Sequence, residues 1–385
     1  MTRIEWEEGG QQRSALWRSE SGWPAPKKVV LADDTMAADT AYRLALDGTA
    51  LLWRGDFQNA RQLVQALARR IDHKGARAKR GKTGAKAGKA APTPTEGFHR
   101  HRLAQLQRAR TLAMLLIPFD ADYTIPLRRA PDVRDACGEA WGPGSEASVA
   151  SLRELLGLIG AHEWRRKGVH IAALDDRIHP WYGVFSPVRG EYVDLVAQAP
   201  LPPHAKLAFD IGAGTGVLGA VLARRGLQRV VATDMDERAL GCARDNLARL
   251  GLLEQVEIVQ ADLFPEGQAD LVVCNPPWLP GKPSSAIEYA IYDPDSRMLR
   301  GFLGGLKAHL APQGEGWLIV SDLAEHLGLR TREQLLNWIA DAGLHVAGRH
   351  DVQPTHGKAQ DADDPLHAAR SREVTSLWRL RVELQ

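Results

Sequence analysis

The sequence predicts an α/β fold whose carboxyl-terminal part is a doubly wound, mostly parallel sheet. From about residue 170 onward, short runs rich in β-branched residues alternate with stretches of helical periodicity. A glycine-rich loop follows the first of these strands, and acidic residues end the next two. Because ligands bind at the carboxyl ends of the strands in such sheets, we expect the functional site at this edge.

Seven strands and at least four helices are expected in this part of the chain, which we define as a domain over 170–385. The strands are expected at 206–212, 229–235, 256–262, 269–275, 316–322, 344–350 and 374–382. The helices are expected to end near Arg225 and Leu250 and to cover 295–310 and 331–342.

Residues 1–169 are expected to form an accessory domain that is α/β or helical. Strands are predicted at 29–34 and 49–57, helices at 35–47, 59–71, 98–116 and 148–168, and a loop at 135–147. Segment 73–91 holds seven Lys or Arg and no acid. Low hydrophobicity with high charge predicts disorder over 73–97. The segment is either a linker or a basic arm that contacts the ribosome or nucleic acid.

The composition is that of an ordinary globular protein, with 44% hydrophobic and 25% charged residues and a net charge of +2. The three cysteines are far apart, so neither a metal site nor a disulfide framework is expected. The amino terminus is polar and acidic, unlike a signal peptide, and no apolar run is long enough to span a bilayer. These features predict a cytoplasmic protein that does not act at a membrane.

The glycine loop carries the first chemical signal. Gly212, Gly214 and Gly216 form a G-x-G-x-G pattern, and glycine lets the backbone approach a ligand closely. Asp234 ends the second strand, where a carboxylate suits a ribose diol. Asp262 ends the third strand, where it can accept a hydrogen bond from an adenine amino group. The loop alone is weak evidence, because tight strand-to-helix turns also use glycine.

Four motifs in order, DIGAGTG (210–216), TDMD (233–236), ADLF (261–264) and NPPW (275–278), resemble those of the class I S-adenosylmethionine-dependent methyltransferases. The resemblance covers roughly 170–385 and implies a Rossmann-like sheet and S-adenosyl-L-methionine as cofactor. It implies cofactor contacts for Asp210, Gly212, Ala213, Gly214, Gly216, Asp234, Met235, Asp262, Leu263 and Asn275. Asp236 is better interpreted as a helix cap.

Two other functions share part of this pattern. A nicotinamide dehydrogenase has a similar glycine loop, but it does not explain the diproline after the fourth strand. A non-catalytic binding module would bind the cofactor without turnover.

NPPW indicates the kind of acceptor. The nitrogen of an amide or an exocyclic amine is a poor nucleophile, because its lone pair is delocalised. The Asn275 side-chain oxygen and the Pro276 carbonyl can accept its two N–H groups. Pro276 and Pro277 stiffen the loop, and Trp278 offers a flat stacking face. The catalytic residues predicted are therefore Asn275, Pro276, Pro277 and Trp278.

Two substrate classes remain open. The tetrapeptide is similar to that of HemK-type enzymes, which methylate a glutamine in release factors or a ribosomal protein, and to that of methyltransferases acting on adenine or guanine in RNA or DNA. The stretch SPVRGEYVDL, with Pro187, Arg189 and Glu191, looks like a partial variant of the HemK-type segment. Tyr182 and Phe185 are candidates to line the acceptor pocket. We favour the protein glutamine, with the base as the alternative.

Overall fold

The chain forms two compact units, described in a computed structural model over residues 2–83, 92–188, 190–283, 286–354, 361–362 and 364–383. Unit 1 comprises Met1–Thr93 and His99–Glu163, and unit 2 comprises Pro94–Phe98 and Trp164–Gln385. The division therefore falls at 163/164, where the sequence suggested 169/170. Unit 2 also takes the short segment 94–98 from the part of the chain that we had assigned to the accessory domain.

Unit 1 contains a six-stranded mixed sheet with the strand order β1-β2-β6-β5-β4-β3. Strands β3, β4 and β5 run parallel, whereas β6 is antiparallel to β5 and β1 is antiparallel to β2. The strands are β1 (Arg3–Glu8), β2 (Gln11–Trp17), β3 (Lys28–Ala32), β4 (Thr49–Trp53), β5 (Leu115–Phe119) and β6 (Ser148–Ser151). The helices are α1 (Ala38–Leu46), α2 (Phe57–Thr83), α3 (Pro94–Leu112), α4 (Arg134–Trp141) and α5 (Leu152–Lys167), with the ends of α3 and α5 lying in unit 2.

Three sequence-based assignments in this region are wrong. Residues 148–151, taken as the start of a helix, form β6, whose four residues are all buried against β5. The helix expected over 98–116 ends at Leu112, and Leu115 already belongs to β5. Residues 135–147 were expected to be a loop, but α4 occupies Arg134–Trp141. The loop signal came from the Gly-Pro-Gly that follows, and Gly142 ends the helix with φ 77°.

The disorder expected over 73–97 is also wrong at both ends of the segment. Helix α2 continues through Thr83, and α3 begins at Pro94. Alanine, lysine and arginine are strong helix formers, so a segment with little apolar character still continues an existing helix. Residues 84–91 lie outside the described part of the chain.

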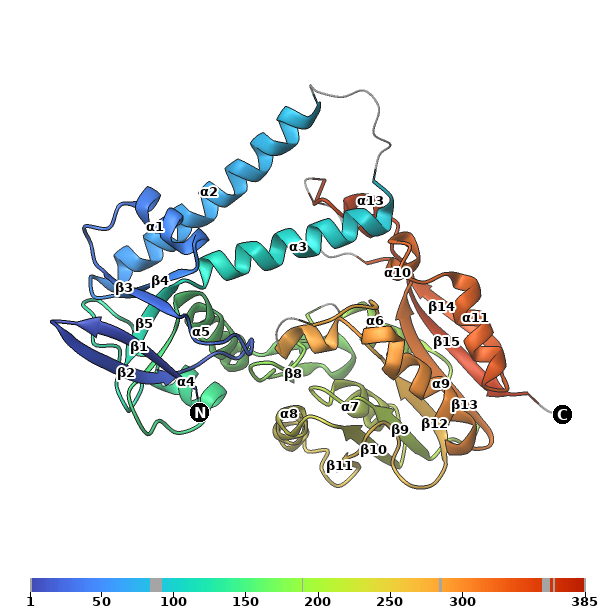
Figure 1. The fold of residues 1–385 in the computed structure, drawn as a ribbon. Helices are drawn as coiled ribbons and strands as arrows, with labels where there is room; N and C mark the ends of the chain where they lie inside the picture. Colours follow the sequence, from blue (N-terminus) through green and yellow to red (C-terminus); the bar gives the residue numbers. More distant parts are fainter. Residues whose placement is uncertain are drawn as a thin grey trace. The chain divides into compact units, whose positions relative to one another are not determined.

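Unit 2 is built on a seven-stranded sheet with the order β11-β10-β9-β12-β13-β15-β14, which can be followed across Figure 1. All neighbours pair in parallel except β15, which is antiparallel to both β13 and β14. The strands are β9 (Leu207–Ile211), β10 (Arg229–Asp234), β11 (Val256–Gln260), β12 (Ala269–Cys274), β13 (Leu310–Ser321), β14 (Leu344–Val352) and β15 (Thr375–Val382). The predicted doubly wound, mostly parallel sheet is confirmed.

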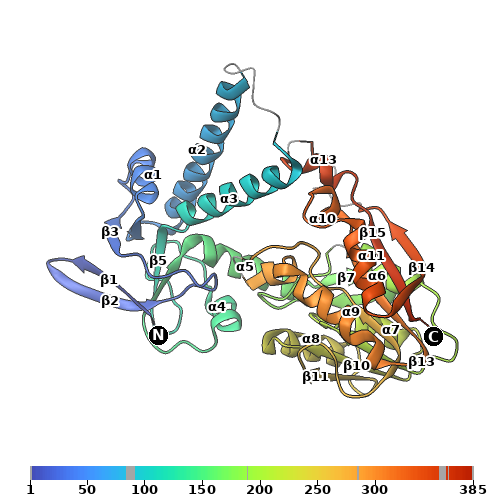
Figure 2. The ribbon, with the colours of Figure 1, turned by 45° about the vertical axis from the view of Figure 1, so that its right-hand side comes forward.

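Helices cover both faces of this sheet. On one face, α6 (Glu191–Gln198), α7 (Val217–Arg224) and α8 (Glu237–Arg249) pack on a cluster that includes Val196, Val221 and Leu247. On the other face, α9 (Arg297–His309) and α11 (Arg332–Asp341) lie beside one another (Figure 2) and bury Phe302 and Ile339. The reversal of strand order between β9 and β12 places the switch point of the sheet beside the glycine loop.

A smaller cluster lies among short elements beyond the sheet. Helices α10 (Leu323–His326) and α13 (His367–Arg370) contribute to this cluster. Separately, a hairpin of β7 (Val169–Ile171) and β8 (Asp176–Ile178) precedes α6. The described residues of the unit also form three 3₁₀ turns: η1 (Ala172–Leu174), η2 (Ala286–Ala290) and η3 (Pro294–Ser296).

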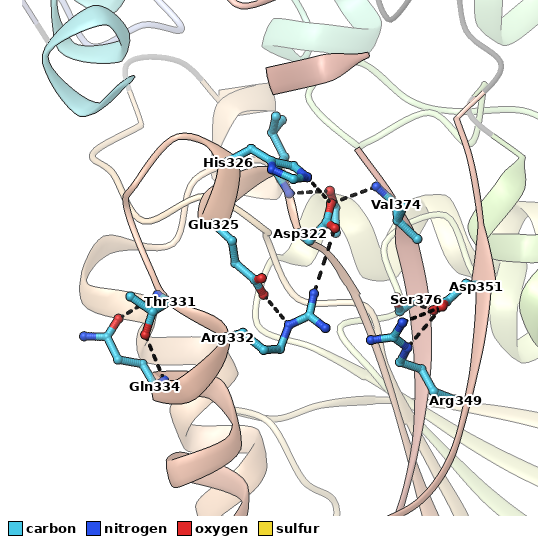
Figure 3. A network of polar contacts seen from close by, with 12 residues as sticks. Asp322, Glu325, His326, Thr331, Arg332, Gln334, Arg349, Asp351, Val374 and Ser376 are labelled. Atoms are coloured by element: carbon cyan, nitrogen blue, oxygen red, sulfur yellow. Dashed lines mark hydrogen bonds and ion pairs between the residues drawn. The ribbon is translucent and has the colours of Figure 1, made fainter. Parts of the chain in front are cut away.

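Polar contacts fasten the antiparallel strand β15 at the carboxyl end of β13 (Figure 3). The Asp322 carboxylate accepts a hydrogen bond from the backbone N–H of Val374 at 2.7 Å. Asp351 on β14 accepts from Ser376 Oγ at 2.7 Å and pairs with Arg349 at 2.6 Å. These contacts satisfy backbone and side-chain groups where β15 enters the sheet, so they fix its register next to β13.

Neither a membrane span nor a metal cluster is found in the described ranges of the chain. No helix among these residues is long and apolar enough to cross a membrane. No group of three or more His, Cys, Asp or Glu side chains among them is arranged to hold a metal ion.

Candidate active site

The glycine loop leaves β9 and is held against the end of β10. The backbone N–H groups of Gly212 and Ala213 both donate to the carbonyl of Thr233, at 2.9 and 2.8 Å. Gly212, Gly214 and Gly216 have φ values of 79°, 53° and 78°, which side chains rarely tolerate. A Cβ at Gly214 would meet no protein atom within 4 Å. The loop therefore presents bare backbone to open space at the carboxyl edge of the sheet.

Asp210 supports this loop from below. Its side chain is buried on β9, and its Oδ2 accepts a hydrogen bond from the N–H of Gly219 in α7 at 2.9 Å. Burial raises the pKa of Asp210 to about 7, and the nearby charge of Asp234 adds to the rise. Asp210 thus fixes the direction in which α7 leaves the loop. A contribution to cofactor binding would come through this orientation of the loop.

Asp234, at the end of β10, lies beside the loop as the sequence predicted. Its Oδ2 accepts from the N–H of Gly214 at 3.0 Å, and its Oδ1 accepts from the N–H of Asp236 at 3.0 Å. Burial raises the pKa of Asp234, although the backbone hydrogen bonds oppose the rise. Each carboxylate oxygen keeps a lone pair for a ligand hydroxyl. The neighbouring Met235 side chain is 55% exposed.

Asp236 caps a helix, as interpreted from the sequence. It is the N-cap residue of α8, and its Oδ1 accepts from the N–H of Arg238 at 3.0 Å. The cap satisfies one of the unpaired N–H groups in the first turn of α8.

Asp262 and Leu263 follow β11 on the adjoining loop. Asp262 is exposed and pairs with Arg297 of α9 at 3.0 Å. Leu263 has φ 76°, and its carbonyl accepts a hydrogen bond from Thr233 Oγ1 at 2.5 Å. Thr233 therefore ties this loop to the same strand end that holds the glycine loop.

The NPPW segment begins where β12 ends, directly beside the glycine loop. Cys274 pairs in register with Ile211, so Asn275 and Gly212 leave the sheet as neighbours. Trp278 Nε1 donates a hydrogen bond to Asn275 Oδ1 at 2.9 Å. The Trp278 side chain is half-buried and packs against both core clusters of the sheet. The indole thereby fixes the orientation of the Asn275 carboxamide.

Two side chains that the sequence did not single out lie next to this loop. Asp293 is buried, and its carboxylate accepts from the N–H groups of Met298 and Leu299 at 3.1 and 3.2 Å, which caps α9. Burial raises the pKa of Asp293. Met298 lies over the loop, because a Cβ at Gly212 would come within 2.7 Å of its terminal methyl carbon. No sequence motif indicates these residues, because they reach the glycine loop only through the packing of α9.

Asn246 is a third such residue and joins the glycine loop to the segment upstream of it. This buried side chain of α8 donates to the carbonyl of Thr215 at 3.0 Å and accepts from the N–H of His179 at 2.7 Å. Its position in the middle of a helical pattern gave no signal.

The segment upstream of the glycine loop, which includes Tyr182 and Phe185, contacts α8. The Arg238 guanidinium stacks over the Tyr182 ring at 5.6 Å, and Phe185 packs against the core. Pro187 is buried, and the half-buried Glu191 is the first residue of α6. Arg189 lies outside the described residues.

The residues present suit S-adenosylmethionine. The backbone of Gly214 faces open space that a ligand can occupy, and the terminal methyl group of Met298 borders Gly212. The Asp234 carboxylate has oxygens of a kind that suits a ribose diol, and Asp262 and Leu263 follow β11, the neighbouring strand. With the fold, this edge defines a class I S-adenosylmethionine-dependent methyltransferase.

Comparison with known proteins gives the family. Residues 178–331 match the family described as methyltransferase small domain. The tRNA1(Val) (adenine(37)-N6)-methyltransferase of Shewanella loihica is 30% identical over 184 residues, which cover 45% of this chain and 72% of that protein. The chain therefore belongs to the methyltransferase small domain family and is an S-adenosylmethionine-dependent enzyme.

Two further relatives act on proteins, according to their names. The release factor glutamine methyltransferase of Cereibacter sphaeroides is 32% identical over 141 residues, covering 33% of this chain and 50% of that protein. The ribosomal protein L11 methyltransferase of Pelotomaculum thermopropionicum is 46% identical over 69 residues, covering 17% and 22%.

Proposed function

We propose that this enzyme methylates a planar amino nitrogen, and that the acceptor is the exocyclic amine of an unpaired adenine in RNA. The observation that carries the reaction type is the hydrogen bond from Trp278 Nε1 to Asn275 Oδ1 at the end of β12. An amide oxygen has two lone pairs, so the second remains for an N–H of the acceptor. Nothing in the transfer of a methyl group to an oxygen acceptor would require such an oriented carbonyl.

The residues of this loop would act on the acceptor as follows. S-adenosylmethionine, when bound, supplies the methyl group as an activated sulfonium. Asn275 Oδ1 and the Pro276 carbonyl accept the two N–H groups of the acceptor. These bonds strengthen as positive charge develops on nitrogen, so they stabilise the transition state more than the ground state. The methylated nitrogen then carries a strongly acidic N–H, so its proton can leave to water without a strong base.

Two observations support RNA as the acceptor, against our preference from the sequence for a protein glutamine. The relative from Shewanella loihica, of which the match covers 72%, is named for an adenine in a tRNA. The sequence between 73 and 91 carries seven Lys or Arg and no acid, and such a segment binds phosphate backbones by charge. An adenine that is unpaired or extruded from its stack can reach Asn275.

A protein glutamine is the second candidate. The match to a release factor glutamine methyltransferase and the Pro187–Glu191 segment support it. A carboxamide presents the same planar NH₂ group to Asn275 as adenine does. The chemistry of the loop therefore serves either substrate.

The test is transfer of tritiated methyl groups from S-adenosylmethionine to two acceptors purified from cells that lack this protein. One is total RNA and the other is purified release factor. We expect label in RNA that digests to N6-methyladenosine, and at least about a hundredfold less of it with Asn275→Ala. Label in the release factor alone would replace the RNA proposal with the glutamine one. Label on an oxygen or carbon atom would overturn the role proposed for Asn275.

A further inference from the structure

The first turn of α3 belongs to unit 2 and is fixed there by a side-chain cap. Thr95 Oγ1 lies 3.1 Å from the carbonyl oxygens of both Leu327 and Gly328, at the end of α10. Leu327 and Gly328 directly follow α10, and their carbonyl groups accept the hydroxyl as a partner outside the helix. Gly328 has φ 67°, and a Cβ there would come within 2.6 Å of Thr95 Oγ1. Both the conformation and the close approach therefore require glycine at this contact.

Phe98, one turn further on, is buried in the small cluster beside α10. The side chain is 3% exposed and packs with Leu279, Leu323 and Leu327. Its ring also lies 6.5 Å from the ring of Tyr292, at an interplanar angle of 47°. Phe98 thus contacts the loop that follows NPPW, although the two lie far apart in the sequence.

Leu279 and Tyr292 close that loop. Leu279, the residue after Trp278, forms an isolated parallel bridge with Tyr292. The N–H of Leu279 donates to the carbonyl of Ile291 at 3.1 Å, and the N–H of Asp293 donates to the carbonyl of Leu279 at 2.9 Å. These bonds set the exit direction of NPPW. The cluster around Phe98 forms the apolar support behind them.

Leu279 and the paired segment Ile291–Asp293, which we call the strap, also reach the cofactor side of the site. Asp293 directly follows Tyr292 and caps α9 through the N–H groups of Met298 and Leu299. The terminal methyl group of Met298 in turn borders Gly212 of the glycine loop. A shift of the strap would therefore move the acceptor motif first and the cofactor loop only through α9.

We propose that Phe98 is a positioning residue for catalysis, which acts through Leu279 and Tyr292 to hold NPPW in its working geometry. Thr95 locks the turn that carries it. The segment 94–98 is accordingly part of the catalytic unit, although it lies about seventy residues before the rest of that unit in the sequence. The proposal concerns the geometry of the site and is independent of the acceptor's identity.

The test compares three variants of the full-length protein. Phe98→Ala removes the ring, Phe98→Leu restores most of the apolar volume, and Leu103→Ala removes a 56% exposed side chain from the same helix as a control. Hydrogen exchange is followed by mass spectrometry on peptides that cover 275–283 and 288–293. We expect Phe98→Ala alone to accelerate exchange at Leu279 and Asp293 by about tenfold or more, because their bonds open locally.

Catalysis supplies the second readout, with total RNA and release factor both offered as acceptors. We expect Phe98→Ala to lower kcat about tenfold, because misplacing the acceptor affects the chemical step. The KM for S-adenosylmethionine and the affinity for S-adenosylhomocysteine should stay within about threefold. Phe98→Leu should recover most of kcat.

Two outcomes would overturn the proposal: unchanged exchange at Leu279 and Asp293, or faster exchange spread equally over β9 and β12. If Phe98→Ala does not fold, Thr95→Val, which removes only the hydroxyl group, must accelerate exchange in the same two peptides. Because amide exchange needs no acceptor, a wrong acceptor assignment would leave this result standing.

Discussion

Trp278 Nε1 donates to Asn275 Oδ1 at 2.9 Å, so the aromatic residue of NPPW orients the amide that we place against the acceptor. The sequence had suggested that Trp278 offers a stacking face, and the structure adds that its indole N–H orients the Asn275 carboxamide. The two roles are separable, because phenylalanine keeps a flat ring but has no N–H group.

Trp278→Phe should therefore lower kcat without affecting the cofactor. Loss of one orienting hydrogen bond corresponds to about 1 kcal/mol, or roughly fivefold to tenfold in rate. Steady-state kinetics with labelled S-adenosylmethionine measure it, and Trp338→Phe on α11 is the matched control. Wild-type turnover in Trp278→Phe would show that Asn275 needs no orientation by the indole.

Asn275→Ala should reduce transfer by at least about a hundredfold, because it removes a preorganised acceptor for the developing charge. The affinity for S-adenosylhomocysteine should change little. Isothermal titration calorimetry and single-turnover transfer separate the two effects. If cofactor affinity falls as steeply as the rate, Asn275 serves mainly in cofactor binding.

Gly214→Ala should weaken cofactor binding through the space that its methyl group takes. The φ of 53° adds strain of about 1 kcal/mol, but no protein atom lies within 4 Å of the new Cβ. Gly251→Ala is the control, because Gly251 has φ 68° and equally open surroundings just beyond the end of α8. Both variants should lose similar stability in urea, and only Gly214→Ala should lose affinity for S-adenosylhomocysteine. Equal affinities would place the cofactor elsewhere.

Asp234→Asn and Asp236→Asn test two acids from the same strand end. Asp234 lies at the loop, and replacing its carboxylate should weaken S-adenosylhomocysteine binding by about tenfold to a hundredfold, the value of a charge-assisted bond to a ribose hydroxyl. Asp236 caps α8, and asparagine caps helices as well as aspartate does, so its variant should bind normally. A large loss of affinity in Asp236→Asn would assign the ribose contact to that residue instead.

Binding to RNA should depend steeply on salt if the basic segment contacts phosphates. Neutralising four of its seven Lys or Arg by substitution with Gln should reduce the slope of log affinity against log salt by about three to four. Fluorescence anisotropy with total tRNA at several KCl concentrations measures the slope. A slope that stays unchanged would make the segment a linker.

The sheet of unit 2 was predictable because its strands are short runs rich in β-branched residues that alternate with stretches of helical periodicity, and these signals are local. The positions of Asp234 and Asn275 were predictable too, because both follow the pattern of a strand and the ends of parallel strands meet at one edge of the sheet. Asp293, Met298 and Asn246 were not, because their roles arise from contacts between elements that sequence periodicity does not encode. Strand β6 was missed because four residues are too few to show a strand periodicity beside the long helical pattern that follows. Helix α4 was missed because the Gly-Pro-Gly after it is a strong loop signal.

Stability should fall as the pH rises through the titration of Asp210. Burial raises its pKa from 3.8 to about 7 in the folded protein. Between these values the folded state binds a proton that the unfolded state has released. Folding is therefore favoured at low pH and loses stability as the pH rises from about 4 to about 7.

Asp210→Asn removes this dependence while keeping an oxygen that can accept from the Gly219 N–H. A pKa rise of about three units corresponds to roughly 4 kcal/mol, so the stability of Asp210→Asn relative to wild type should increase by that order between pH 4.5 and pH 8. Urea unfolding at the two pH values measures it, and taking the difference between the two proteins cancels the other titrating groups. A difference that is constant with pH would show that the folded and unfolded states share one pKa at Asp210, and the buried carboxylate would then be charged throughout this range.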